Sequence, residues 1–333
     1  MINYQDNTPY RNCLLCPRRC GVNREALGQA PGPLPAGLCG ETAALKLAFA
    51  GLHMGEEPPI AGYGGSGTIF ISGCNLGCSF CQNYQISREG MGREVSAGEF
   101  AQICLALRDR GAENINLVTG SHAAPALALG LEGALNQGLN IPVVWNSSAY
   151  ESIESLELLK DYIDIYLPDL KTLDKDFAER HFKAPDYPLR AKEAILKMME
   201  YRNLKFAPGK QLISGLMVRH LVVPGHLDTT REVLSWFAHN CKGGALLSLM
   251  TQYTPVYGGQ GRGEVPGRSK IPGRYVSESE YAAVMAMLEE FGLSEGFCQE
   301  LVTGSDWLPD FNLENPFSSK LSQLVWHWKK GFV

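Results

Sequence analysis

From Thr68 onward, apolar runs alternate with amphipathic stretches along the chain. Six runs rich in β-branched residues have the length and composition of buried strands, and they occupy residues 68–72, 114–119, 142–146, 162–167, 214–223 and 245–250. Helical patterns separate or follow these runs, at residues 96–111, 124–138, 151–162, 190–203, 227–240 and 277–292. This alternation predicts parallel strands joined by right-handed crossovers. Because six units are too few for a closed eight-stranded barrel, the pattern predicts an α/β fold with a partial (β/α)6 barrel, whose active groups lie at the C-terminal ends of the strands.

The flanks of this region have different patterns. The N-terminal part is irregular and rich in cysteine, apart from a helical stretch predicted at 41–53. Near the other end, residues 317–333 predict an amphipathic helix whose Trp326 and Trp328 pack on the barrel. The chain therefore divides into an N-terminal cysteine-rich metal-binding segment, a barrel and a C-terminal extension that packs on the barrel, at residues 1–66, 67–295 and 296–333.

Composition narrows the class of protein. The chain has 333 residues, 45% of them hydrophobic and 20% charged, which is typical of a globular protein with a sizeable core. Its net charge of −5 argues against a surface devoted to nucleic acid. We see neither an N-terminal apolar signal nor a run of 18 apolar residues, so no membrane span is predicted and the expected location is the cytoplasm. There, ten cysteines favour metal binding or catalysis over disulfides.

Three of the cysteines lie in the stretch "ISGCNLGCSFCQN", directly after the first predicted strand. Cys74, Cys78 and Cys81 are spaced C-x3-C-x2-C, and Gly73 and Gly77 allow the tight backbone that such a loop requires. Thiolates suit iron–sulfur clusters and zinc. Three ligands leave one coordination position open, which usually indicates chemistry. A structural zinc site that takes a fourth ligand from elsewhere is the alternative.

The stretch "GCNLGCSFCQN" resembles the cluster loop of radical S-adenosylmethionine (radical SAM) enzymes, with Phe80 at the aromatic position. The resemblance implies that Cys74, Cys78 and Cys81 bind a [4Fe-4S] cluster whose fourth iron is chelated by S-adenosylmethionine (SAM). It also implies that the reduced cluster cleaves SAM to methionine and a 5′-deoxyadenosyl radical, which takes hydrogen from a substrate, and that Phe80 contacts the adenine. Within the superfamily, the chain is most similar to homologues of the pyruvate formate-lyase activating enzyme, in segments 53–87, 116–125, 143–152, 164–172, 218–226 and 248–255.

The ends of the predicted strands supply candidate SAM contacts: Thr119, Gly120, Ser121, His122, Asn146, Ser148, Asp169, Lys171, Arg219 and Gln252. Activating enzymes carry Gly-Gly-Glu where this chain has Gly120-Ser121-His122, so the acid of that motif is missing here. Asp169 and Lys171 match an Asp-Leu-Lys that contacts SAM in those enzymes. The alternatives are a surface ion pair for Asp169 and Lys171, and turn chemistry for the Asn and Ser residues.

A second cysteine group precedes the barrel. Cys13, Cys16, Cys20 and Cys39 are spaced C-x2-C-x3-C-x18-C, which is enough for a closed zinc site or a second iron–sulfur cluster, and both remain open. Three arginines among them are expected either on a solvated loop or at a partner contact: Arg18, Arg19 and Arg24. The three remaining cysteines are expected to be structural: Cys104, Cys241 and Cys298.

These features predict a radical SAM enzyme that abstracts hydrogen from a protein or peptide. The resemblance implies a one-electron donor such as flavodoxin or ferredoxin as a second partner. A radical SAM enzyme that modifies RNA or a small metabolite is one alternative, and it predicts either nucleotide binding by the arginines of the Gly/Pro/Arg-rich loop at 251–276 or a closed small pocket. A non-enzymatic iron–sulfur or zinc protein is the other.

Overall fold

The structure is a computed structural model that describes residues 9–26, 37–256, 272–302, 304–305 and 307–333. Most of the predicted loop at 251–276, namely 257–271, lies outside the described residues, so the role proposed for its arginines stays a prediction. In the described part, no helix combines the length and the apolar character that crossing a membrane requires.

One sheet organises the described chain. Its strands, in chain order, are β1 (Leu45–His53), β2 (Ser66–Ile71), β3 (Arg93–Val95), β4 (Ile115–Val118), β5 (Val143–Ser147), β6 (Ile165–Pro168), β7 (Lys205–Phe206), β8 (Leu212–Leu221), β9 (Leu246–Met250), β10 (Phe297–Cys298), β11 (Ser322–His327) and β12 (Gly331–Phe332). Hydrogen bonds join them in the order β10-β9-β8-β6-β5-β4-β2-β1-β11-β12, while β3 pairs with β1 and β7 with β8. The order is an open path, so the barrel is partial.

The predicted (β/α)6 unit forms the middle of this sheet. Strands β2, β4, β5, β6, β8 and β9 pair in parallel, each with its neighbour. Parallel strands are covered on both faces, and these six strands are accordingly almost continuously apolar and buried. The α/β partial barrel predicted from the sequence is therefore confirmed, and the C-terminal ends of its strands meet at one edge.

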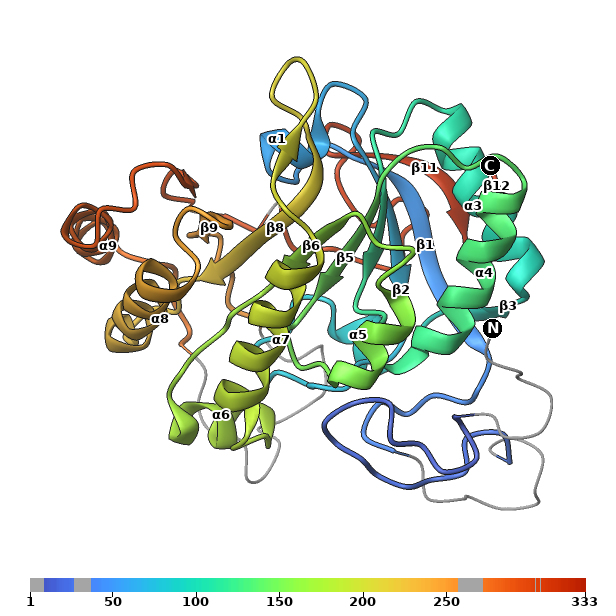
Figure 1. Cartoon of the computed structure of the whole chain (residues 1–333), viewed down its shortest axis with the longest axis horizontal. Helices are drawn as coiled ribbons and strands as arrows, with labels where there is room; N and C mark the ends of the chain where they lie inside the picture. The colour runs from blue at the N-terminus through green and yellow to red at the C-terminus, as the bar shows by residue number, and fades with distance from the viewer. Residues whose placement is uncertain (1–8, 27–36, 257–271, 303, 306) are drawn as a thin grey trace.

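Helices connect the parallel strands and pack against the sheet (Figure 1). They are α1 (Pro58–Ala61), α2 (Tyr84–Ser87), α3 (Ala97–Asp109), the 3-10 helix η1 (Ser121–Ala123), α4 (Ala124–Asn136), α5 (Ile153–Leu159), α6 (Lys175–Phe182), α7 (Tyr187–Tyr201), α8 (Leu227–Asn240) and α9 (Glu278–Glu290). Sequence signals set several helix starts. The Ser96 side chain accepts from Glu99 N at the start of α3, and Ser277 with Glu280 forms a capping box on α9.

Both predicted flanking helices are wrong. Residues 45–53 form β1, which pairs antiparallel with β2 on one side and with β11 on the other. The stretch at 317–333 contains β11 and β12 in place of an amphipathic helix. Trp326 is buried, and its indole Nε1 donates to Glu99 of α3. The flanks thus extend the sheet beyond β2.

The N-terminal cysteine segment, residues 9–26 and 37–44, packs beside the barrel. In Figure 1 its dark-blue trace runs below α5, near the start of β1. The Leu15 carbonyl accepts hydrogen bonds from Ser152 (2.7 Å) and Ser155 (2.5 Å) at the start of α5. These bonds place the segment close to the strand ends, where polar residues gather.

Candidate functional site

The cysteine loop, residues 73–81, follows β2 and is held by groups outside it. The guanidinium of Arg18 donates to the carbonyls of Asn75 (2.9 Å) and Leu76 (3.1 Å). From the other side, Arg88 donates to two further carbonyls of the loop, those of Gly77 and Cys78. Two arginines thus bind the backbone of a loop that has little secondary structure of its own.

Phe80 lies inside an aromatic cluster. Its ring centroid is 5.9–6.2 Å from four other rings, those of Phe177, His181, Phe182 and Tyr253. The Ser79 side chain adds a contact to His181 Nδ1 at 2.8 Å. The cluster anchors the C-terminal half of the cysteine loop on α6.

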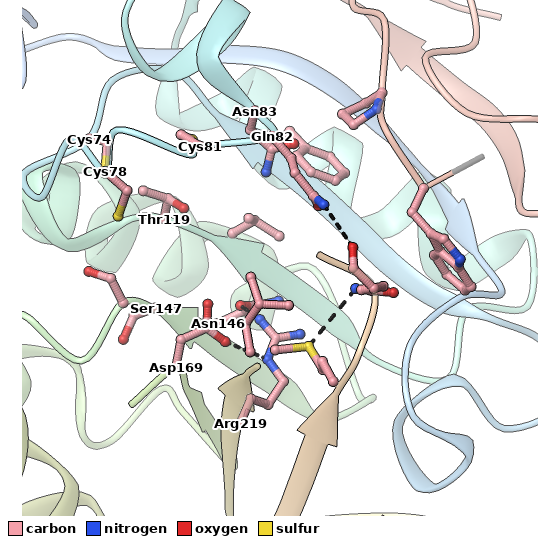
Figure 2. Close-up of a pocket in the computed structure, with 18 of the residues that line it drawn as sticks. Cys74, Cys78, Cys81, Gln82, Asn83, Thr119, Asn146, Ser147, Asp169 and Arg219 are labelled. Carbon is pink, nitrogen blue, oxygen red and sulfur yellow. Dashed lines mark hydrogen bonds and ion pairs between the residues drawn. The ribbon is translucent and has the colours of Figure 1, made fainter. Parts of the chain in front are cut away.

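A cavity of about 230 Å³ opens between the cysteine loop and the strand ends (Figure 2). All three loop cysteines line it, and Figure 2 shows them above the strand ends that carry Asn146, Asp169 and Arg219. Burial raises the pKa of the Cys78 thiol to about 12, and it also raises the pKa of Cys74. These buried thiols are therefore protonated without a metal, and metal binding would displace their protons.

A network of largely buried charges forms the floor of the cavity. Arg219 Nε lies 2.8 Å from Asp169 Oδ1, its Nη1 lies 3.1 Å from Glu56 Oε2, and its Nη2 donates to Asn146 Oδ1 at 2.6 Å. Lys171 Nζ completes the network at 3.0 Å from Asp169 Oδ2. Arg219 lies in β8 and Asn146 in β5, while Asp169 directly follows β6, so the network joins three strands.

The charges in this network do not ionise alike. Burial opposes ionisation of Asp169, but Arg219 and Lys171 outweigh it and hold the pKa of that carboxyl below its usual range. Glu56 pairs with the same Arg219 but lacks the contact with Lys171 that Asp169 has, and burial raises the pKa of the Glu56 carboxyl. Beside the cavity, burial lowers the pKa of His53 to about 4, so its imidazole is neutral at pH 7.

Two strand ends carry left-handed backbone on residues other than glycine. Thr119 has φ 63° directly after β4, and Ala149 has φ 59° shortly after β5. Such conformations cost roughly 1–3 kcal/mol each and tend to occur at functional sites. Thr119 lines the cavity, and its backbone N–H donates to Asn146 O at 2.9 Å. The strain therefore falls where the strands end at the cavity.

Most predicted site residues come together here. The cavity lining includes Cys74, Cys78, Phe80, Cys81, Thr119, Asn146, Ser148, Asp169, Lys171, Arg219 and Gln252. Three predicted contacts do not line it. Gly120 packs so closely that a Cβ there would lie 2.8 Å from the Trp145 ring. Ser121 donates to Glu151 at 2.6 Å, and His122 faces the N-terminal cysteine segment. These three residues turn away because the chain enters η1 at Ser121, with Gly120 as its N-cap.

Sequence reasoning missed the groups that hold the strand ends in place. The Tyr187 hydroxyl lies 3.0 Å from Ser148 O and 2.8 Å from Asp169 O, and it accepts from Lys171 N at 2.9 Å. Glu151 accepts from Trp145 Nε1 at 3.2 Å. These side chains act on backbone or on buried partners from other segments, so no local motif marks them.

The second cysteine group also lines one cavity. Cys13, Cys16, Cys20 and Cys39 surround a small space of about 10 Å³, together with Arg24 and His122. In the part of the chain that the structure describes, no group of three or more His, Cys, Asp or Glu side chains meets tightly enough to hold a single metal ion. The predicted solvated loop does not hold for all three arginines of this segment, because Arg24 is only 1% exposed.

Comparison with known proteins defines the class. The model of the radical SAM superfamily matches residues 68–234, which span the cysteine loop and the parallel strands. An uncharacterized protein of Methanocaldococcus jannaschii, MJ0674, is 33% identical over 258 residues, which are 74% of this chain and 68% of that protein. The chain belongs to the radical SAM superfamily. Superfamily membership makes it an enzyme that uses a [4Fe-4S] cluster and SAM.

Solved structures of low similarity were also found. Streptococcus suis SuiB bound to precursor peptide SuiA has 16% identity and a TM-score of 0.46, with coverage of 72% of this chain and 50% of SuiB. SuiB bound to S-adenosylmethionine has 14% identity and a TM-score of 0.43, with coverage of 68% and 45%. The chain thus spans about half the length of SuiB.

The residues around the main cavity fit both the [4Fe-4S] cluster and SAM. Three thiols on one loop face the cavity, which suits a cluster held at three of its corners. The hydroxyl of Ser148 is buried in the same lining without a hydrogen-bond partner among the described residues, so it can bond a ligand. Lys171 and Asp169 add one charge of each sign, as the carboxylate and ammonium of SAM require.

Proposed function

We propose that the chain is a radical SAM enzyme of the activating-enzyme type, which abstracts hydrogen from a protein or peptide. When bound together, the reduced cluster and SAM supply a 5′-deoxyadenosyl radical, the oxidant that removes the hydrogen. The electron comes from a one-electron donor such as flavodoxin or ferredoxin. The contributions of the chain are to hold these groups, to orient them and to receive the substrate.

The assignment of roles follows the lining of the cavity. Cys74, Cys78 and Cys81 hold three irons and leave the fourth to SAM. We assign Lys171 to the SAM carboxylate, since it lies near the Cys78 thiol and Asp169 stabilises its positive charge. Asn146 and Ser148 are placed to bond the ribose hydroxyls or the ammonium group. Asp169 orients Lys171 and Arg219 by ion pairs to both.

The neutral character of the cavity beyond these residues supports a peptide substrate. Within the described lining, Arg219 is paired with Asp169 and Glu56, and Lys171, which pairs with Asp169, is the cation assigned to the SAM carboxylate, so neither cation is left for a substrate. A nucleic-acid substrate would need unpaired positive charge for its phosphates. This observation favours a peptide over RNA, and it is the one on which the choice of substrate rests.

Amide groups at the cavity rim suit a peptide backbone. Gln82 Nε2 donates to Gln252 O at 3.2 Å, and Gln299 Nε2 donates to Gln252 Oε1 at 2.9 Å. Figure 2 shows the first of these bonds as a dashed line from Gln82. Neutral amides match the donors and acceptors of a peptide bond without charge. Aromatic side chains continue the lining beyond them, those of Phe70, Trp307 and Phe317.

The proposal is tested by following hydrogen. The protein, reconstituted with iron and sulfide without oxygen and then reduced, is incubated with unlabelled SAM and an extract of cells grown in deuterated medium. Mass spectrometry then measures deuterium in 5′-deoxyadenosine. We expect the deuterium donor to be in the macromolecular fraction, to be destroyed by protease and to survive ribonuclease. A donor in the small-molecule fraction, or one lost with ribonuclease, would overturn the choice of substrate.

Two cysteine variants separate the reaction from its substrate. Cys78→Ala should abolish SAM cleavage, because the cluster loses one of its three protein ligands. Cys298→Ala is the matched control, since Cys298 lies outside both cysteine groups, and it should retain cleavage. Cleavage that persists in Cys78→Ala would show that the loop is not the site.

A further inference from the structure

The N-terminal cysteine segment brings four thiols to the lining of one small cavity beside the barrel. Cys13, Cys16, Cys20 and Cys39 line the same small cavity, and the backbone at Gly37 approaches so closely that a Cβ there would lie 2.8 Å from Cys20 Sγ. Cys13, Cys16 and Cys20 are close in sequence, but 18 residues separate Cys20 from Cys39, so the fold brings Cys39 to the other three. The thiols face this cavity without meeting at one point, and metal binding would draw them together.

Arg24 is a buried cation beside these thiols, and a negative charge nearby would stabilise it. Arg24 is 1% exposed, and its guanidinium donates to the carbonyls of Thr42 (2.6 Å), Glu41 (3.0 Å) and His122 (2.6 Å), and to Cys13 Sγ (3.7 Å). The Glu41 carboxylate pairs with Lys46. No ion pair between described residues involves Arg24. A buried charge without a counter-charge is strongly unfavourable, and thiolates bound to a metal would supply that charge.

His122 gives a second and independent indication. It is 3% exposed and lines the same cavity. Its Nε2 lies 2.8 Å from Ser72 O, so Nε2 donates, while Nδ1 is buried without a partner among the described residues. Buried polar atoms are rarely left unsatisfied in a folded protein. An unpartnered nitrogen on a cavity lined by four thiols is expected where a ligand belongs.

The segment also contacts the cysteine loop of the main site. Asn75, next to Cys74, lines the N-terminal cavity as well. Arg18 follows Cys16 by two residues, and its guanidinium bonds Asn75 O and Leu76 O on the loop and Phe182 O (2.7 Å) at the end of α6. Any group that holds Arg18 in place therefore also holds the backbone of the cysteine loop in place.

We propose that Cys13, Cys16, Cys20 and Cys39 bind a thiolate-ligated metal centre, and that this centre positions the cysteine loop through Arg18. The same four thiolates serve a zinc ion or an iron–sulfur cluster, and the metal content distinguishes the two. This inference concerns a site separate from the main cavity and does not depend on the substrate proposed above.

Metal analysis of the full chain tests the first part. A variant without the main site, Cys74→Ser with Cys78→Ser and Cys81→Ser, should still carry either one zinc or about four irons with acid-labile sulfide. Adding Cys13→Ser and Cys16→Ser should remove that metal, while adding Cys298→Ser should not. A metal-free parent variant, or metal that survives the loss of Cys13 and Cys16, would overturn the site.

A titration covers the case in which the five-serine variant fails to fold. The parent variant, stripped by chelator, should regain thermal stability in proportion to added Zn²⁺ or to iron with sulfide, and the gain should saturate at one centre per chain. A melting temperature that stays constant across both titrations would contradict the proposal. Because the main site is absent from this variant, failure here is distinct from failure of SAM cleavage.

Arg18 is tested as a positioning residue. Arg18→Ala should speed the loss of iron from the main cluster to a chelator about tenfold, because second-shell partners typically contribute 10–100-fold to metal affinity. Arg18→Lys should restore part of the iron retention. Arg19→Ala is the matched control, since Arg19 is exposed and its guanidinium lies 3.8 Å from Glu154, away from the cysteine loop. Equal rates of iron loss in the Arg18 and Arg19 variants would refute the positioning role.

Discussion

Gly73 is a point of close contact between the cysteine loop and the N-terminal segment. It directly precedes Cys74 and has φ +83°. A Cβ added there would lie 2.4 Å from Glu41 Cγ, 2.9 Å from His122 Nε2 and 3.0 Å from Cys39 O. Gly73→Ala therefore pushes the start of the cysteine loop away from the N-terminal segment. Gly77 offers a matched position on the same loop, with φ +70° and nothing within 4 Å of its added Cβ.

The geometry gives different magnitudes for the two variants. An alanine in the left-handed region costs roughly 1–2 kcal/mol, and both variants incur that cost. Only Gly73→Ala adds an overlap with buried atoms, which costs typically about 1–3 kcal/mol more. We therefore expect Gly77→Ala to lower the free energy of unfolding by about 1–2 kcal/mol and Gly73→Ala by about 2–5 kcal/mol.

Denaturant unfolding of the metal-free proteins measures this difference, and iron retained after chelator challenge measures its effect on the loop. Gly73→Ala should lose iron faster than Gly77→Ala, because only Gly73 touches the N-terminal segment. If the two variants are equally destabilised and lose iron at equal rates, the close contact between the segments does not support the loop and the reasoning fails.

Three further outcomes follow from the charge and hydrogen-bond networks. Arg219→Met should lower the free energy of unfolding by about 3–5 kcal/mol in denaturant titration, because Asp169 and Glu56 lose their shared buried cation. Tyr187→Phe should lower the free energy of unfolding by about 1–3 kcal/mol and raise the KM for SAM, since the strand ends lose the hydroxyl that orders them. The bonds from Arg274 lower the pKa of Glu280 to about 2. That carboxylate therefore stabilises the fold above its ordinary pKa and loses this effect as the pH falls toward 2. In thermal melts, the wild-type protein should be more stable than Glu280→Gln by roughly 1 kcal/mol at pH 7, and the two should be equally stable near pH 2.

The sequence predicted the six parallel strands because their signal is local. A strand buried on both faces must be apolar along its whole length, and this requirement is visible in the chain without knowledge of its neighbours. The flanks failed for the opposite reason. The stretch "LKLAFAGLH" is rich in Ala and Leu, which favour helices, yet β1 forms because β2 and β11 supply partners on both of its edges. Of these two partners, β11 is distant in sequence.

The same division holds at the site. Asn146, Asp169 and Arg219 could be predicted because strand ends converge at one edge of a partial barrel. His122 could not be placed, since the turn into η1 reverses its direction and sends it toward the N-terminal cavity. Arg18 could not be assigned either, because its hydrogen bonds to the loop go to backbone carbonyls, which leave no trace in the residue types of the loop.

The pairing of β1 with β11 has a consequence for synthesis of the protein. About 270 residues separate the two strands, so at 5–20 residues per second the outer edge of β1 waits roughly 15–50 s for its partner to leave the ribosome. An apolar strand with an open edge is a template for intermolecular pairing. Chains that stall or are cut before β11 should therefore aggregate through β1, and chaperones that cover strand edges should be needed most during this interval.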